Sequence, residues 1–183
     1  SMQIHYQNGI ELFTRENEYI RFSVAPSLGG KIVSVYNKQL GKEFLWHNEA
    51  LQLEKYEAGA DYDTHFWGGI DELLPNDIAE SVEGNAYPDH GELWTTPLHY
   101  VCTDGRISMY RKLPVSGLYY QKTLYTAAEE PLIYIHYHIK NLAAATRRFL
   151  WKLHAALVIQ PGDRLETSAR RAVPVYPESC RFP

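Results

Sequence analysis

Few cysteines, no long apolar run and no signal segment limit what this sequence can encode. Its 183 residues contain two cysteines, Cys102 and Cys180, whose separation fits neither a metal-binding spacing nor a disulfide framework. No apolar run approaches the ~20 residues of a transmembrane helix, so a membrane is not an expected partner. The first residues lack the basic region and the apolar region that a signal peptide has, so we expect a cytoplasmic location.

An excess of basic charge is also absent. The chain has 18 Lys and Arg against 22 Asp and Glu, a formal net charge of −4. Nucleic acid is therefore not an expected partner, because phosphate binding needs a basic face. The sequence has no HExxH motif, phosphate-binding glycine loop or nucleophile elbow, and we expect neither a cofactor nor a metal. His136 and His138 alternate along one segment but have no third ligand in register, which favours an exposed face.

Sustained helical spacing is missing as well, and strand-like alternation takes its place. Residues 20–24 and 132–141 alternate apolar and polar side chains. Asn8-Gly9 and Asp104-Gly105 are strong hairpin signals. Turn signals every ten residues or so predict an all-β fold, an antiparallel β-sandwich in one domain over residues 1–183. Further strands are expected over residues 92–94, 147–159 and 164–167.

The segment His65–Trp94 is too irregular to be one strand or one helix. Glycines and prolines interrupt it, and it contains two Trp, two His and seven acidic residues. A long irregular segment in a regular domain is either functional or disordered, and aromatic content this high argues against disorder. We expect an ordered loop that builds a site on the β scaffold. Residues 51–59 before it fit either a loop or one helical turn.

Two histidines have the most informative surroundings. On a strand over residues 90–94, His90, Glu92 and Trp94 would share a face suited to a polar ring, although His90 could instead cap a loop. On a strand over residues 147–159, Lys152 and His154 would point away from the core. The core-facing residues there would be Phe149, Trp151, Leu153, Ala155 and Leu157. The charge of Lys152 would favour neutral His154, and a purely structural role for His154 stays open.

Several ordered pieces of the chain resemble the aldose 1-epimerase (galactose mutarotase-like) family. They are residues 25–35 (APSLGGKIVSV), Gly68-Gly69 followed by Glu72 and Pro75, residues 90–94 (HGELW), Asn141, and residues 151–154 (WKLH). The resemblance implies a supersandwich of antiparallel strands, incomplete at the C-terminus, with a sugar on its concave face. His90 and His154 would contact the ring oxygen and neighbouring hydroxyls.

The resemblance also implies roles for further residues. Mutarotation needs a base for the anomeric hydroxyl and an acid for the ring oxygen. We expect His154 to be the acid and His90 to orient the substrate, a monosaccharide or related sugar. The expected substrate-binding residues are Trp67, Asp71, Glu72, Asn76, Glu92, Trp94 and Lys152.

The chain departs from the family pattern in two places. No Arg or Lys occurs between Lys55 and His90, and the family's C-terminal glutamate base has no counterpart, with Glu72 or Glu92 as possible substitutes. A non-catalytic sugar-binding module is therefore the alternative, and a purely structural β domain is the third reading. A sandwich that lacks strands would leave open edges, which predicts a homodimer that covers them.

Overall fold

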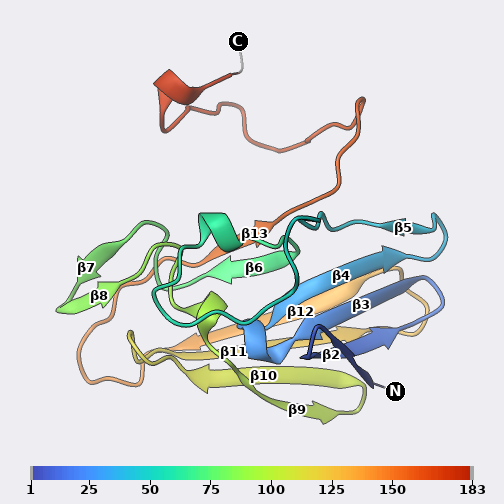
Figure 1. The fold of residues 1–183 in the computed structure, drawn as a ribbon, viewed down its shortest axis with the longest axis horizontal. Helices are drawn as coiled ribbons and strands as arrows, with labels where there is room; N and C mark the ends of the chain where they lie inside the picture. Colours follow the sequence, from blue (N-terminus) through green and yellow to red (C-terminus); the bar gives the residue numbers. More distant parts are fainter. Residues whose placement is uncertain (1, 182–183) are drawn as a thin grey trace.

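The computed structural model describes residues 2–181 as an antiparallel β-sandwich, as the sequence predicts (Figure 1). The seven-stranded sheet has the order β1 (Gln3–Gln7), β2 (Ile10–Glu16), β3 (Ile20–Ala25), β4 (Lys31–Asn37), β6 (Ile70–Leu73) and β13 (Lys152–Ala155), with β5 (Lys42–Glu43) on β4. The four-stranded sheet has the order β12 (Ile133–Lys140), β11 (Tyr119–Thr126), β10 (Arg106–Lys112) and β9 (His99–Thr103). A separate hairpin joins β7 (Glu80–Val82) and β8 (Asn85–Tyr87).

The main core lies between the two large sheets. Phe22 and Val24 of β3 are fully buried, as are Tyr120 and Leu124 of β11. Successive side chains of a strand point to opposite faces, so the alternation seen in the sequence puts these residues inside. Burial of each such side chain stabilises the fold by about 1.5–3 kcal/mol. The opposite face of the seven-stranded sheet remains available for polar side chains.

The two hairpin signals are confirmed. Asn8 and Gly9 have φ values of 49° and 75°, and they join β1 to β2. Asp104 and Gly105 have φ values of 51° and 72°, and they join β9 to β10. Two consecutive residues with positive φ are the requirement of a tight type I′ turn.

The long strand expected over residues 147–159 is wrong in extent. Only β13 is a strand, because its partner β6 has four residues. Outside β13, Leu157 forms an isolated β-bridge with Leu45, and Leu150 N donates a hydrogen bond to Pro75 O. Trp151 packs against the core, but Leu153 and Leu157 are 49% and 55% exposed. They are exposed because no strand of the four-stranded sheet pairs or packs over them.

The short strand expected over residues 92–94 is also wrong. Residues Leu93–Thr95 form a 3₁₀ turn, η3, that begins after Glu92. The carbonyl of Glu92 accepts hydrogen bonds from the hydroxyls of Thr95 and Thr96, which close this turn. His90, Glu92 and Trp94 therefore do not share a strand face. Two other 3₁₀ turns, η1 (Pro26–Leu28) and η2 (Asp63–His65), lie in connections between strands.

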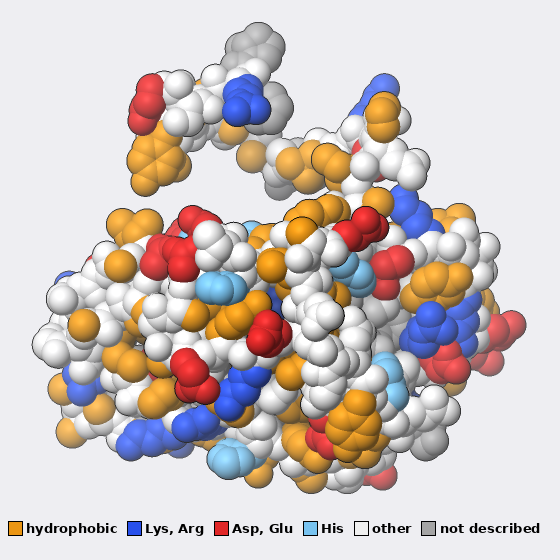
Figure 2. All heavy atoms as spheres, in the orientation of Figure 1, with side chains coloured by type: hydrophobic (Ala, Val, Ile, Leu, Met, Phe, Trp, Pro, Cys, Tyr) orange, Lys and Arg blue, Asp and Glu red, His pale blue; other side chains and the backbone are white. Residues whose placement is uncertain are grey.

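Residues 160–181 extend away from the sandwich (Figures 1 and 2). Every residue in this stretch is exposed, with Leu165 at 96%, and its regular structure is the 3₁₀ turn η4 (Pro177–Ser179). The strand expected over residues 164–167 is wrong, because that segment has no partner strand among residues 2–181. Across those residues we find no helix with the length and apolar character needed to cross a membrane.

Candidate functional site

The candidate site lies on the outer face of the seven-stranded sheet, where β6 meets β13. Asp71 of β6 and His154 of β13 are directly opposite each other in the antiparallel register. Their neighbours Glu72 and Leu153 point to the other face. On the face shown in Figure 2, acidic and histidine side chains lie beside apolar ones over the loops that cover β6. Strand pairing therefore brings together two groups that are 83 residues apart in sequence.

Asp71, His154 and Tyr62 form one hydrogen-bonded group. The hydroxyl of Tyr62 lies 2.9 Å from Asp71 Oδ2 and 2.8 Å from His154 Nδ1, and His154 Nδ1 lies 3.0 Å from Asp71 Oδ1. Burial, and then the charge of Asp71, raise the pKa of Tyr62, so its hydroxyl stays protonated and donates to the carboxylate. His154 Nδ1 must then be a donor as well. Its Nε2 is left free for a proton exchange with a ligand.

The charge on Asp71 is maintained inside the protein. Burial would raise the pKa of Asp71, but Lys31 and hydrogen bonds from His154 and Tyr62 outweigh burial and lower it. The Lys31 amine lies 3.6 Å from Asp71 Oδ2 and donates a 2.7 Å hydrogen bond to the carbonyl of Gly68. Burial lowers the pKa of Lys31 in turn. At neutral pH Asp71 is therefore a carboxylate that fixes the orientation of the His154 ring.

His90 forms a second Asp–His pair on the other side of Tyr62. Its Nδ1 lies 2.9 Å from Asp89 Oδ2, which leaves Nε2 free. Its ring stacks on the Tyr62 ring, with centroids 3.9 Å apart and planes 8° apart. The backbone of His90 is left-handed (φ 62°), an uncommon conformation that is found in functional loops. A Cβ on the next residue, Gly91, would lie 2.4 Å from a backbone oxygen, so only glycine lets this loop approach β6.

Aromatic rings complete the site around Tyr62. Trp94 meets the Tyr62 ring edge-on, at a centroid distance of 5.1 Å and an angle of 87°. Phe66 stacks against both Tyr62 and His154, at 5.5 Å and 5.1 Å. Such faces combine an apolar surface with polar edges, the combination that suits a sugar ring. The predicted residues His90, His154, Asp71 and Trp94 thus all contact Tyr62.

The space beside this cluster is small. A cavity of about 20 Å³, lined by Lys31, Tyr56, Tyr62, Trp94 and others, lies next to Asp71. Such a volume holds about one water molecule. The ring of Tyr62 occupies the space between the two histidines, and a pyranose can enter only if Tyr62 moves. Tyr62 lies in the connection between β5 and β6, and it belongs to no strand or β-bridge itself.

Two predicted substrate ligands, Glu72 and Glu92, are instead bound within the protein interior. Glu72 pairs with the buried Lys122 and accepts a hydrogen bond from Tyr137. Burial raises the pKa of Glu72 despite these partners. Glu92 accepts hydrogen bonds from the backbone amides of Val115 (2.7 Å) and Ser116 (3.0 Å). These carboxylates are positioned to hold the scaffold.

Asn76, Trp67 and Lys152 border the site without entering it. Asn76 is fully buried and donates to the carbonyls of Ile78 and Pro88, which shapes the loop before His90. Trp67 is 8% exposed and stacks on His47 at 4.2 Å. Lys152 points outward like His154, as expected, and it forms an ion pair with Asp77. The hydrogen bond from Lys152 is the main cause of the lowered pKa of Asp77.

The sequence analysis missed the central residue, Tyr62. It follows the segment 51–59, whose structure the sequence left open, and no periodic pattern links it to either histidine. Its own motif, Tyr62-Asp63-Thr64-His65-Phe66-Trp67, concentrates aromatic and polar residues, and this composition was the available signal. Lys31 was missed because it begins a strand and is followed by the apolar Ile32 and Val33.

One group of side chains has the spacing of metal ligands. Asp63, Asp89 and His90 place one ligand atom each within 4.8 Å of one another. Both aspartates are exposed, and Asp89 already pairs with His90. These residues could reach one cation, although the arrangement works equally as a hydrogen-bonded support for His90.

Comparison with known proteins supports the fold and leaves the activity open. A family model described as a domain of unknown function, DUF5107, matches residues 3–90, just under half of the chain. The match includes Tyr62, Asp71 and His90 and ends before His154. No curated protein matches the sequence.

Two solved structures resemble the fold. One is a TPR-domain containing protein from Parabacteroides distasonis, with a TM-score of 0.54 and 19% identity, over 73% of this chain and 21% of that one. The other is a 4-alpha-glucanotransferase from Thermococcus litoralis, with a TM-score of 0.50 and 13% identity, over 76% of this chain and 24% of that one. This chain thus spans only about a fifth to a quarter of the length of either protein.

Proposed function

We propose that this protein binds an aldose and interconverts its anomers by acid–base ring opening, without a cofactor. The observation that carries the proposal is the pair of Asp–His units, Asp71–His154 and Asp89–His90, on either side of Tyr62. Each aspartate accepts from Nδ1 and leaves Nε2 free for proton exchange, and both imidazole rings lie beside the ring of Tyr62. The resemblance to the aldose 1-epimerase family motivates the choice of reaction.

In this mechanism one histidine accepts a proton from the sugar and the other histidine donates a proton to it. His90 Nε2 takes the proton of the anomeric hydroxyl while the bond from C1 to the ring oxygen breaks and C1 becomes an aldehyde carbon. His154 enters this step as an imidazolium whose Nδ1–H is bonded to Asp71, gives its Nε2 proton to the ring oxygen and becomes neutral. Rotation about the bond between C1 and C2, followed by the reverse transfers, closes the ring on the other face. His90 thus supplies the base in place of Glu72 or Glu92, which are held in the interior, and His154 keeps its expected role as the acid.

Tyr62 is the gate in this proposal. Its ring lies where the sugar would bind, between His90 and the aromatic face of Phe66. When the connection that contains it shifts, the sugar takes over the stacking position and the hydrogen bonds that Tyr62 releases. Loops that open and close over a site are common where water must be kept out of the reaction.

A non-catalytic sugar-binding module is the second candidate. It is supported by the two solved structures, in which a fold of this kind occupies only part of a longer chain. One of these proteins is named as a 4-alpha-glucanotransferase. We further propose that the open edge at β13 is covered by a second copy of the chain. A cytoplasmic location stays a prediction from the sequence.

Polarimetry of freshly dissolved α-D-glucose and α-D-galactose separates the two candidates. We expect the wild type to speed the approach to anomeric equilibrium, and His154→Gln to lower the protein-dependent rate about 100-fold or more. His99→Gln is the matched control, since His99 is exposed on β9 of the other sheet. Binding of either sugar by the wild type with no change in rate would favour the module and reject the enzyme.

A further inference from the structure

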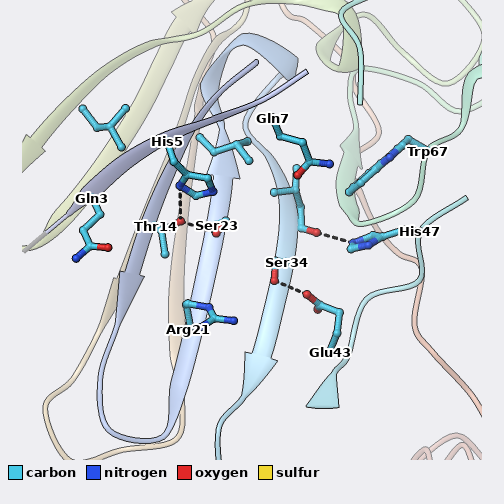
Figure 3. Close-up of a pocket in the computed structure, with 13 residues that line it drawn as sticks. Gln3, His5, Gln7, Thr14, Arg21, Ser23, Ser34, Glu43, His47 and Trp67 are labelled. Atoms are coloured by element: carbon cyan, nitrogen blue, oxygen red, sulfur yellow. Dashed lines mark hydrogen bonds between the residues drawn. The ribbon is translucent and has the colours of Figure 1, made fainter. Parts of the chain in front are cut away.

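A second hollow lies on the outer face of the same sheet, over β1 to β5 (Figure 3). Its volume is about 500 Å³, within the range of small-molecule sites. Its lining includes the polar side chains of His5, Thr14, Arg21, Ser23, Ser34 and Glu43. Neither His90 nor His154 lines this hollow, so its chemistry is independent of the site around Tyr62.

A row of hydroxyl groups crosses the floor of the hollow. Thr14 of β2 pairs with Ser23 of β3, and Ser23 pairs with Ser34 of β4. The hydroxyls of Thr14 and Ser23 are 2.6 Å apart, and His5 Nδ1 lies 3.3 Å from the hydroxyl of Thr14. Thr14 and Ser23 are only 8% and 6% exposed, unlike polar side chains on an ordinary solvated sheet face. The register of β2, β3 and β4 therefore places hydroxyl donors and acceptors side by side across the recessed floor of the hollow.

One wall of the hollow is a fixed aromatic pair. The Nε2 of His47 lies 2.6 Å from the carbonyl of Val33, and a carbonyl only accepts, so Nε2 carries a hydrogen. The ring of His47 also stacks on Trp67. In a neutral imidazole, Nδ1 then remains as an acceptor for a ligand hydroxyl. Figure 3 shows both rings on the side of the hollow opposite His5.

The hollow is lined by one carboxylate, Glu43, and one guanidinium, Arg21, whose charges are opposite. Glu43 accepts from the hydroxyl of Ser34 and from the backbone amides of Val35 (2.9 Å) and Leu45 (3.1 Å), which fixes its carboxylate. The guanidinium of Arg21 lies over the ring of Tyr36 at 4.6 Å. In the part of the chain that the structure describes, Arg21 forms no ion pair, so its donors remain available.

We propose that this hollow binds a neutral saccharide. Neutral sugars need donors and acceptors in close alternation, which Arg21, Glu43, His47 and the hydroxyl row supply. A carboxylate in the wall disfavours phosphate and other anions, because like charges repel. Trp67 lines both this hollow and the cavity beside Tyr62, which places the two on neighbouring parts of one sheet face. The inference does not require that the Tyr62 site be catalytic.

Amide NMR spectra of the full chain test the proposal. We expect saturable shifts at Ser23, Ser34 and His47 on titration with at least one of D-glucose, D-galactose, maltotriose and cellotriose. The same shifts should persist in His154→Gln, which separates this hollow from the proposed enzyme site. Arg21→Gln should weaken binding about tenfold. Arg106→Gln should leave it unchanged, since Arg106 lies over Tyr125 at 3.8 Å in the other sheet.

Three results would overturn the inference. The first is the absence of saturable shifts at these amides with all four sugars. The second is equal affinity in Arg21→Gln and the wild type. The third is tighter binding of D-galacturonate or inorganic phosphate than of every neutral sugar, which would assign the hollow to anions. If Arg21→Gln does not fold, Gln3→Ala replaces it. Gln3 lies on the exposed edge strand β1, so its replacement should not disturb folding. Gln3 also lines the hollow, and we expect about threefold weaker binding.

Discussion

At the scale of single residues, hydrogen bonds decide which polar groups are free to act. His154 and His90 each commit Nδ1 to an aspartate, while Glu72 commits Oε1 and Glu92 both carboxylate oxygens to partners in the interior. The sequence could single out the two histidines from their surroundings. The sequence could not show that Tyr62 is part of the site or that Glu72 is not. Both facts depend on contacts between residues that are far apart in the sequence.

Replacement of Asp71 tests the first of these pairs. Asp71→Asn leaves Lys31 buried without its carboxylate, and we expect a loss of about 3 kcal/mol of unfolding free energy at pH 7. The protein-dependent anomerisation rate should fall at least about tenfold, because the His154 ring loses its fixed orientation. Denaturant unfolding and polarimetry measure the two effects.

The pH dependence of that stability loss follows from the lowered pKa of Asp71. A carboxyl whose pKa is lower in the folded state stabilises the fold above its unfolded pKa, 3.8, and this contribution disappears as the pH falls through the folded value. The difference between the wild type and Asp71→Asn should therefore be full at pH 7 and shrink below about pH 4. An equal difference at pH 7 and pH 3 would show that folding does not lower the pKa of Asp71.

At the scale of elements, one buried ion pair ties the two sheets together. Lys122 of β11 donates to Glu72 of β6 and to the carbonyl of Gly30, 2.8 Å away. Both charged side chains are fully buried. Local patterns predicted the hairpins and most strands correctly. The length of β13 and the turn at η3 were missed, because they depend on the length of β6 and on contacts of Glu92 that sequence spacing does not encode.

Removal of one partner of this pair should be costly, and removal of both should cost less. We expect Lys122→Met to lower the unfolding free energy by about 3–5 kcal/mol, since it leaves Glu72 unpaired in the interior. The double variant Lys122→Met, Glu72→Leu should recover a large part of that loss. Lys140→Met, at an exposed position of β12, serves as the control and should change stability by less than about 0.5 kcal/mol. A double variant as unstable as the single one would refute this interpretation.

At the scale of the whole molecule, the seven-stranded sheet ends at the edge strand β13, which pairs with β6. Large apolar side chains are exposed along and around β13: Phe149, Leu150, Leu153, Leu157 and Ile159. Contiguous exposed apolar side chains of this kind mark an interaction surface. The sequence predicted open edges from the family resemblance, and the exposure of these side chains is consistent with a second copy covering them.

Light scattering measures this self-association. We expect a dimer at micromolar concentration, and a monomer for the double variant Leu153→Glu, Leu157→Glu, because two buried carboxylates would oppose the interface. Leu165→Glu is the control, since Leu165 is 96% exposed in the segment that leaves the sandwich. A wild-type monomer across the concentration range would exclude the dimer and leave the site around Tyr62 unaffected.

The central claim is that two imidazoles act together on one sugar ring. Magnetisation exchange between the anomeric proton signals of an aldose at equilibrium tests it most directly, because it measures interconversion without any change in composition. The account predicts exchange cross-peaks for glucose or galactose with catalytic amounts of the wild type, and their loss with either His90→Gln or His154→Gln. Exchange no faster than in buffer for both sugars, or undiminished exchange in either variant, would contradict it.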